Sequence, residues 1–209
     1  MNKKNVGILI FDDVEVLDFS GPFEVFSRTS IKKGTQSRLD EKFSPFNTFT
    51  FSIDGKVITA TGGMKVIPSY SVFNMPRIDI IIIPGGLGTR KLLNNEETIL
   101  WIKDLPNKAA MIASVCTGSL LLAKAGLLRN KQATTHWSAI ELLQSIDKSI
   151  NIMKKNRIVE DTIITSAGVS SGIDMAFYIV SKFYGERVAQ NTAKYIEFNR
   201  SQNIISEIK

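Results

Sequence analysis

The most constraining feature of this chain is a buried strand that passes into a buried helix with no loop between them. Residues 109–115 read AAMIASV, an apolar run typical of a parallel strand, and residues 120–125 read LLLAKA, a helix predicted to end at Gly126. Cys116 stands at the turn between them. A strand–helix corner of this kind strains the backbone and presents the side chain at its apex. The pattern therefore predicts a nucleophile elbow with Cys116 at the apex.

The chemistry predicted for Cys116 follows from its place at a helix N-terminus. The helix dipole and the unpaired N–H groups there favour thiolate over thiol, and the thiolate is the nucleophilic form. Ser114 and Gly118, two residues to either side, are small enough for close packing around a corner. The alternative is a structural cysteine, because free cysteine packs well as a small apolar side chain. We favour the reactive interpretation.

The rest of the chain alternates between apolar runs typical of strands and runs typical of helices. Strands are predicted at 6–11, 49–53, 57–60, 78–83 and 132–134, hairpins at Asp54-Gly55 and around Asp161, an exposed loop at 31–47, and helices at 98–105, 138–144, 173–184 and 186–196. Another helix is predicted to open at Pro22, with Gly21 as its cap. This order predicts an α/β fold, a doubly wound sandwich with a mostly parallel central sheet and β-hairpin embellishments. A chain of 209 residues is expected to form a single domain, 1–209, around one core.

In doubly wound sheets, functional sites lie beyond the carboxyl ends of the strands. Three segments of this chain meet that description: the turn after Phe11, the loop at Gly85-Gly86, and Cys116. Because these ends share one edge of the sheet, we expect the three segments to converge on one site.

The composition excludes several classes of protein. One cysteine cannot form an intramolecular disulfide, so the chain fits a reducing compartment. The basic and then apolar start resembles a signal peptide, but its apolar run stops at Asp12 and Asp13 without a cleavage pattern. No apolar stretch reaches the length that spans a membrane. We therefore expect a cytoplasmic protein that does not contact membranes.

The net charge of +6 makes nucleic acid a candidate partner. The basic residues are scattered, however, and the tight groups away from the N-terminus, Lys32-Lys33 and Lys154-Lys155 with Arg157, are not interleaved with aromatic residues. A solvated basic surface is the favoured interpretation, so no nucleic-acid partner is expected. One histidine and one cysteine cannot supply a closed metal-ligand set, and residues 85–88 lack the spacing and the lysine of a phosphate-binding loop. No metal or cofactor is expected.

Five short segments, spread over essentially the full length, carry a resemblance to a known family: LDFSGPFEVF at 17–26, IPGG at 83–86, SVCTG at 114–118, ATTHW at 133–137 and SAGVSSGID at 166–174. Together they resemble the ThiJ/PfpI superfamily, which shares a flavodoxin-like core with the class I glutamine amidotransferases. This resemblance implies a flavodoxin-like sandwich, a nucleophilic cysteine and a homodimer.

Within the superfamily the chain is most similar to isonitrile hydratases and to the sensor domain of AraC-type regulators. Asp18 carries much of this resemblance, because isonitrile hydratases have an aspartate where much of the superfamily has a glutamate. Cys116 and Thr117 match their Cys-Thr pair at the elbow. The AraC-type relatives continue into a DNA-binding helix-turn-helix unit that this sequence lacks, so the resemblance to regulators covers their sensor half.

The resemblance assigns roles to several residues. Asp18 is expected to lie between the first strand and the helix, where its carboxyl group exchanges a proton with the substrate. Glu24, at about the third helical position, is interpreted as a back-capping, structural residue. The N–H groups of Gly85, Gly86 and Thr117 are candidate oxyanion donors, although a tight turn alone explains the two glycines. The Thr117 hydroxyl is expected to orient water or substrate.

Three further residues are assigned mainly structural roles. His136 is the only histidine, and no other histidine follows the elbow as an amidotransferase triad requires, so a pocket-lining or structural role is favoured over a catalytic one. Trp137 is interpreted as pocket wall or core. Asp174, at the start of a predicted buried helix, is interpreted as a cap.

These expectations converge on a cysteine-dependent hydratase that acts on a small molecule, similar to isonitrile hydratase. The Cys116 thiolate would attack the terminal carbon of an isocyanide to give a thioimidate. Asp18 would supply the proton and then activate water, and the product would be an N-substituted formamide. Two alternatives stay open: a non-catalytic ligand or redox sensor related to AraC-type regulators, and another superfamily activity such as a glyoxalase-like hydratase or an amidase.

Overall fold

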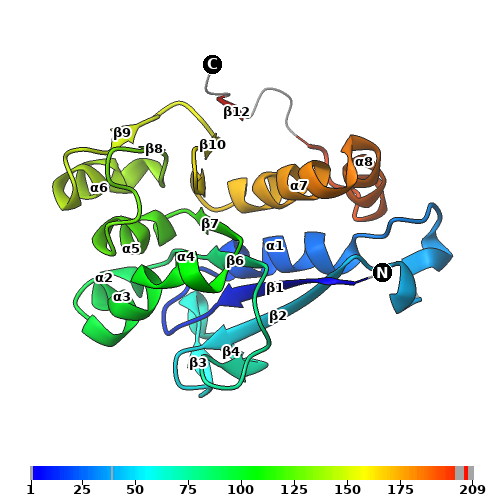
Figure 1. The fold of residues 1–209 in the computed structure, drawn as a ribbon, viewed down its shortest axis with the longest axis horizontal. Helices are drawn as coiled ribbons and strands as arrows, with labels where there is room; N and C mark the ends of the chain where they lie inside the picture. Colours follow the sequence, from blue (N-terminus) through cyan, green and yellow to red (C-terminus); the bar gives the residue numbers. More distant parts are fainter. Residues whose placement is uncertain (1, 39, 201–204, 207–209) are drawn as a thin grey trace.

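A single eight-stranded sheet runs through the computed structural model, which describes residues 2–38, 40–200 and 205–206 (Figure 1). Its strands, in spatial order, are β12 (Ile205–Ser206), β10 (Ile158–Glu160), β11 (Ile164–Ser166), β7 (Met111–Val115), β6 (Ile80–Ile83), β1 (Lys4–Leu9), β2 (Phe46–Ser52) and β5 (Tyr70–Ser71). All neighbours in the sheet pair in parallel except β10 and β11. The predicted α/β fold with a mostly parallel sheet is therefore confirmed.

Two groups of helices cover the sheet (Figure 1). Helices α1 (Val16–Arg28), α7 (Ser171–Tyr184) and α8 (Glu186–Tyr195) contact one another. The second group comprises α2 (Thr89–Leu92), α3 (Glu96–Lys103), α4 (Leu105–Lys108), α5 (Gly118–Lys124) and α6 (Ile140–Ile146). Among the described residues, no helix is both long and apolar enough to cross a membrane.

The core lies where the central strands are covered by helices on both sides. All four residues of β6 are fully buried, as a central parallel strand requires. The largest side chains in the core come from α1, β2 and α7, namely Phe26, Phe51 and Phe177. The carboxyl ends of β1, β6 and β7 consequently form one rigid edge of the sheet.

Helix α1 begins six residues earlier than predicted, which corrects the assignment of Pro22 to its first position. The helix starts at Val16, and Pro22 lies inside it. Pro22 removes one helical hydrogen bond, but the helix continues because its apolar face, which includes Phe19 and Phe26, is buried against the core. Glu24 therefore stands in the helix body and not at a back-capping position; it is exposed and lies 4.0 Å from Arg28.

The predicted hairpin at Asp54-Gly55 was wrong. The turn exists, since Gly55 has a φ of 76° and Asp54 accepts the N–H of Lys56, but the flanking strands do not pair. Strand β2 instead pairs with β1 and β5, and β3 (Ile58–Thr59) pairs antiparallel with β4 (Lys65–Val66). The Asp54-Gly55 sequence thus predicted the turn correctly, but it did not predict which strands pair.

The remaining assignments differ mainly in their details. The hairpin around Asp161 is confirmed by the antiparallel pairing of β10 and β11. The segment 31–47 is not a simple exposed loop: it contains 3-10 helices at Thr35–Arg38 and Glu41–Phe43 and the start of β2. The predicted strand at 132–134 is present as β8 (Gln132–Ala133), which pairs outside the main sheet with β9 (Asn151–Ile152).

Candidate active site

Cys116 occupies the predicted strained corner between β7 and α5. Its φ of 55° lies in the left-handed region, which non-glycine residues adopt only at a cost of about 1–2 kcal/mol. The backbone is held on both sides: its N–H lies 3.1 Å from the carbonyl oxygens of Ser166 and Ala167, and its carbonyl accepts hydroxyl hydrogen bonds from Ser119 and Thr135, both at 3.1 Å. These contacts from β11, α5 and the segment after β8 fix the direction of the cysteine side chain.

Asp18 reaches the same corner from the first turn of α1. It was predicted to precede the helix, but it lies inside it because α1 begins at Val16. The side chain is 0% exposed, and its Oδ2 accepts the N–H of Gly85 at 2.9 Å. Among the described residues Oδ1 has no hydrogen-bond partner, while the neighbouring Cys116 side chain acts to lower the pKa of the carboxyl group. The acid and the sulfur are therefore partners.

The N–H groups of Gly85 and Gly86 are already paired inside the protein, which corrects their assignment as free oxyanion donors. Gly85 donates to Asp18, and Gly86 donates to Thr117 Oγ1 at 3.0 Å. Both glycines instead permit close packing. The backbone N–H of Thr117 does point toward the site. It and the backbone N–H of Val169 both act on the Cys116 sulfur as donors.

Burial controls the protonation of the acid–thiol pair. Loss of solvation raises the pKa of Asp18 to about 7, the negative charge of Glu15 adds to this rise, and the Gly85 N–H opposes it. Burial also raises the pKa of Cys116 to about 12, and the charge of Asp18 adds to that rise against the hydrogen bonds from Thr117 and Val169. The expectation of a thiolate was therefore wrong for the unliganded site, because desolvation outweighs the helix N-terminus. At neutral pH the sulfur is a thiol beside a carboxyl group close to its midpoint.

A pocket of about 150 Å³ opens onto Cys116, and Asp18 lies buried behind it. Its lining comprises Glu15, Gly86, Leu87, Arg90, Cys116, Thr117, His136, Ser138 and Val169. A larger hollow of about 670 Å³ between α3 and α5 is lined by no cysteine, serine, threonine or histidine. The small pocket is therefore the candidate active site, and it admits a narrow, compact reacting group.

The pocket contains residues that the sequence did not indicate. Glu15 was missed because α1 was predicted to begin too late. Arg90 was missed because α2 is a single short turn after the glycine loop, without an apolar pattern of its own. Val169 belongs to a recognised segment, but its contact with the sulfur depends on how α7 packs. A recognisable helix-capping residue before Val16 would have placed the start of α1 correctly and so indicated Glu15.

His136 lies in the pocket wall, and its ring is held by neighbouring residues. Its Nδ1 lies 2.7 Å from Ser138 Oγ, and a methyl group on Gly168 would come within 2.2 Å of its Cδ2. Trp137 beside it is 77% exposed, so the interpretation as core was wrong. Asp174 is fully buried and pairs with Arg157 at 2.6 Å, which replaces its predicted role as a cap.

Replacement of Gly85 by alanine is expected to destabilise the protein by about 1–3 kcal/mol, the usual cost of overpacking. The new methyl group would lie 2.5 Å from the N and Oγ1 atoms of Thr117 and 2.9 Å from Asp18 Oδ2. Urea unfolding measures the loss. Gly7→Ala is the matched control with milder contacts, because its methyl group would come no closer than 3.0 Å to the Ile78 side chain and 3.2 Å to the Phe51 ring. Equal stability of the two variants would contradict the tight packing described for Gly85.

Comparison with known proteins places these features in context. The DJ-1/PfpI family model matches residues 4–182. Isonitrile hydratase of Pseudomonas putida is 32% identical over 194 residues, which cover 92% of this chain and 78% of that protein. The HTH-type transcriptional regulator GbdR of Pseudomonas aeruginosa is 21% identical over 202 residues, which cover 97% of this chain and 53% of the regulator. The chain thus spans about half the length of that regulator.

The fold has a similar counterpart among solved structures. A ThiJ/PfpI family protein from Pseudomonas syringae superposes with a TM-score of 0.82 at 26% identity, covering 97% of this chain and 78% of that chain. The similarity therefore extends over nearly the whole of this chain.

Proposed function

The chain belongs to the DJ-1/PfpI family, and on that premise we propose that it hydrates isocyanides to N-substituted formamides. The observation that carries the proposal is the partnership of a fully buried Asp18 with the thiol of Cys116, which lines a small pocket. The 32% identity to isonitrile hydratase supports the same reaction. The enzyme would then be a cysteine-dependent hydratase with Cys116, Asp18 and Thr117 as its reacting groups.

The first step joins the thiol to the isocyanide. The terminal carbon of an isocyanide accepts both a nucleophile and a proton, so addition of S–H to that carbon gives the thioimidate R–N=CH–S–Cys116. The Asp18 carboxylate takes the proton from the sulfur as the C–S bond forms and delivers it to the carbon. No net proton enters or leaves. A resting thiol beside a carboxylate therefore suits this addition, and no prior thiolate is needed.

The second step adds water to the thioimidate carbon. Asp18 accepts a proton from the water and passes it to the nitrogen, which gives the tetrahedral adduct R–NH–CH(OH)–S–Cys116. The C–S bond then breaks, the hydroxyl proton returns through Asp18 to the sulfur, and R–NH–CHO leaves. The hydroxyl of Thr117, which lines the same pocket, would hold the water. One water is consumed and the thiol is restored.

The substituent of the substrate is expected to be apolar. A pocket of about 150 Å³ holds the linear isocyano group and little else, so the substituent must lie across the rim. Leu87 lines the pocket, and the ring of Trp137 lies 5.4 Å from that of His136, which also lines it; Leu87 and Trp137 are 68% and 77% exposed. Contact between these side chains and an apolar substituent removes both from water, which stabilises the bound substrate.

Trp137→Ser is therefore expected to raise KM for cyclohexyl isocyanide about tenfold, with kcat little changed. The same variant should leave the kinetics for methyl isocyanide nearly unaltered, because methyl does not reach the rim. Phe73→Ser, which removes an aromatic ring that is 82% exposed and does not line the pocket, is the matched control. An equal rise in KM for both substrates would contradict the predicted contact.

Turnover by the purified protein tests the proposed function. Methyl, n-butyl and cyclohexyl isocyanide are incubated with the protein, and formamide is measured by chromatography against a protein-free blank. Methylglyoxal in parallel assays tests a glyoxalase-like activity. Absence of formamide from every isocyanide would refute the proposal.

A ligand-sensing domain is the second candidate, and the match to a transcriptional regulator over 97% of this chain favours it. It predicts that small molecules bind the pocket without being consumed, which calorimetry would detect in the same samples. Redox sensing fits the site less well, because burial raises the pKa of Cys116 and so lowers its thiolate fraction. Intact mass after mild peroxide, with Cys116→Ser as the control, separates the two forms of sensing.

A further inference from the structure

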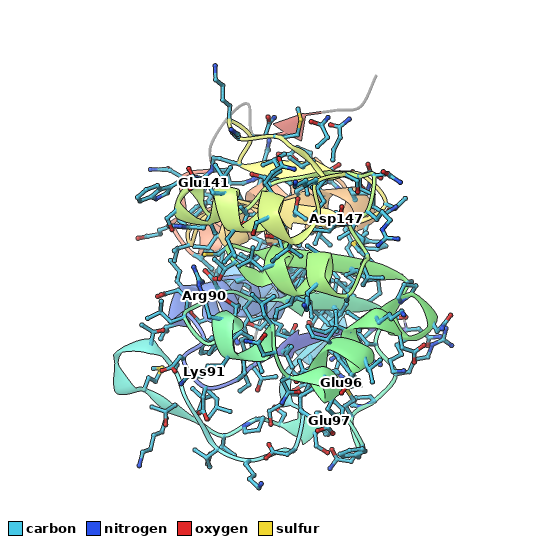
Figure 2. The ribbon with its side chains drawn as sticks, turned by 90° about the vertical axis from the view of Figure 1, so that its left-hand side faces the viewer. Arg90, Lys91, Glu96, Glu97, Glu141 and Asp147 are labelled. Atoms are coloured by element: carbon cyan, nitrogen blue, oxygen red, sulfur yellow. The ribbon has the colours of Figure 1, made fainter. Side chains whose placement is uncertain are left out.

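Thr117 is connected to two residues that the proposed chemistry does not use. Thr89, fully buried at the start of α2, donates its hydroxyl to the carbonyl oxygen of Gly86 at 2.7 Å. Arg90 Nη1 donates to Thr89 Oγ1 at 3.1 Å and approaches the same carbonyl at 3.3 Å. Figure 2 shows Arg90 on this side of the molecule, between Lys91 and Glu141. The cluster therefore extends from the surface to the floor of the pocket.

The Gly86 carbonyl is approached by more donors than it can accept. A carbonyl oxygen has two lone pairs. The Thr89 hydroxyl at 2.7 Å, the Thr89 N–H at 3.2 Å, Arg90 Nη1 at 3.3 Å and the Thr117 hydroxyl at 3.2 Å all lie within reach of it. The shortest of these contacts belongs to Thr89. The hydroxyl and N–H of Thr89 can fill both lone pairs, so the Thr117 hydroxyl competes for an acceptor that is already filled.

The other inward acceptor for Thr117 is more distant and already has a nearer donor. Thr89 Oγ1 lies 3.3 Å from Thr117 Oγ1, but it already accepts the hydrogen bond from Arg90. Thr117 Oγ1 in turn accepts the N–H of Gly86, which fixes the oxygen in place while leaving its proton free to rotate. The direction that remains for this proton is the pocket, toward the Cys116 sulfur.

We propose that Thr89 and Arg90 are positioning residues that direct the Thr117 hydroxyl proton at the reacting sulfur and water by occupying its inward acceptors. Its consequence for turnover rests on the proposed hydration. Neither residue touches the reacting atoms in this role. Without the Thr89 hydroxyl, one lone pair of the Gly86 carbonyl opens to the Thr117 hydroxyl at 3.2 Å, which is nearer than Arg90 Nη1 at 3.3 Å.

Kinetics of Thr89→Val test the role in turnover. The variant keeps the shape of threonine, and its kcat for methyl isocyanide is expected to fall about tenfold with KM little changed, as for loss of one hydrogen bond. Thr89→Ser, which keeps the hydroxyl, should restore kcat. In a double-mutant cycle, Thr89→Val combined with Thr117→Val should be no slower than Thr117→Val alone. Additive losses would overturn the proposal.

Alkylation of Cys116 by iodoacetamide tests the same arrangement without any isocyanide. A hydroxyl proton directed at the sulfur favours the thiolate, so its loss should move the pH profile of alkylation to higher pH in both Thr89→Val and Thr117→Val. Thr192→Val, which removes a buried hydroxyl bonded to Val188 in α8, should leave the profile in place. An unmoved profile in Thr89→Val would overturn the proposal.

A surface variant covers the case in which Thr89→Val does not fold. Arg90→Met removes the donor to Thr89 and should shift the alkylation profile in the same direction, while Arg90→Lys should shift it less. An Arg90→Met profile identical to wild type would also count against the positioning role. If the wild type hydrates no isocyanide while the alkylation shifts appear, the proposed function fails and the positioning of Thr117 stands.

Discussion

Cys116→Ala is expected to abolish formamide production from isocyanides, with kcat reduced by at least about a thousandfold. Both proposed steps pass through a bond to the sulfur, and no other cysteine exists in the chain to replace it. The pocket would still bind substrate, because Leu87 and the other residues that line it are unchanged. The expected signature is therefore lost turnover with retained affinity, measured by single-turnover assays and by calorimetry.

Cys116→Ser is the matched variant for this prediction. It preserves the volume of the corner closely but replaces the thiol with a much weaker acid and nucleophile, so its activity is expected to be as low as that of Cys116→Ala. Circular dichroism should show the native fold in both, since the backbone of residue 116 is held by main-chain groups and by the hydroxyls of Ser119 and Thr135. Formamide production by either variant above the blank would rule out the covalent route.

The elbow could be predicted from the sequence because it is encoded locally. An apolar strand, a single turning residue and a helix are adjacent in the chain, and they need no distant partner to be recognised. The parallel sheet then placed the carboxyl ends of β1, β6 and β7 together by topology. The start of α1 could not be read in this way, since burial of Phe19 and Phe26 overrides the local signal of Pro22.

The ionisation of the site could not be predicted, because it depends on burial by segments that are distant in the sequence. Cys116 is 5% exposed, and its surroundings include α1, the loop after β6 and the segment before α7. A helix N-terminus is visible in a sequence, whereas the loss of solvation that outweighs it appears only in three dimensions. The same limit explains the oxyanion assignment: the sequence shows that Gly85 and Gly86 have N–H groups near the site, but not that Asp18 and Thr117 already accept them.

Asp18→Asn is expected to lose activity and gain stability at the same time. The amide cannot carry a proton from sulfur to carbon, so turnover should fall by about a hundredfold or more. For the wild type, kcat/KM is expected to rise with pH through about 7, as the buried carboxyl group becomes a carboxylate that can accept the thiol proton. Asp18→Asn should lack this rise in its residual activity. A wild-type rate that falls across the same range would show that the acid form of Asp18 is the active one.

The gain in stability follows from the raised pKa of Asp18. An unfolded aspartate ionises near its ordinary value of 3.8, but the folded protein keeps the proton until about pH 7, so the folded state binds more protons between these values. Rising pH therefore destabilises the wild type across this window, by roughly 4 kcal/mol once pH exceeds 7. The amide side chain of the variant cannot ionise and avoids this loss. Asp18→Asn should thus be more stable than wild type at pH 8.5, with a gain that shrinks to about 1 kcal/mol near pH 4.5.

Urea unfolding at the two pH values measures this difference directly. Glu24→Gln, which neutralises an exposed carboxyl group on the same helix, is the control and should change stability little at either pH. If Asp18→Asn were less stable than wild type at pH 8.5, the carboxylate would have to be better stabilised in the fold than its single N–H partner, Gly85, indicates. A gain confined to high pH would instead show that the folded protein carries a buried charge at a cost, and the proposed proton transfer gives a functional reason for keeping it.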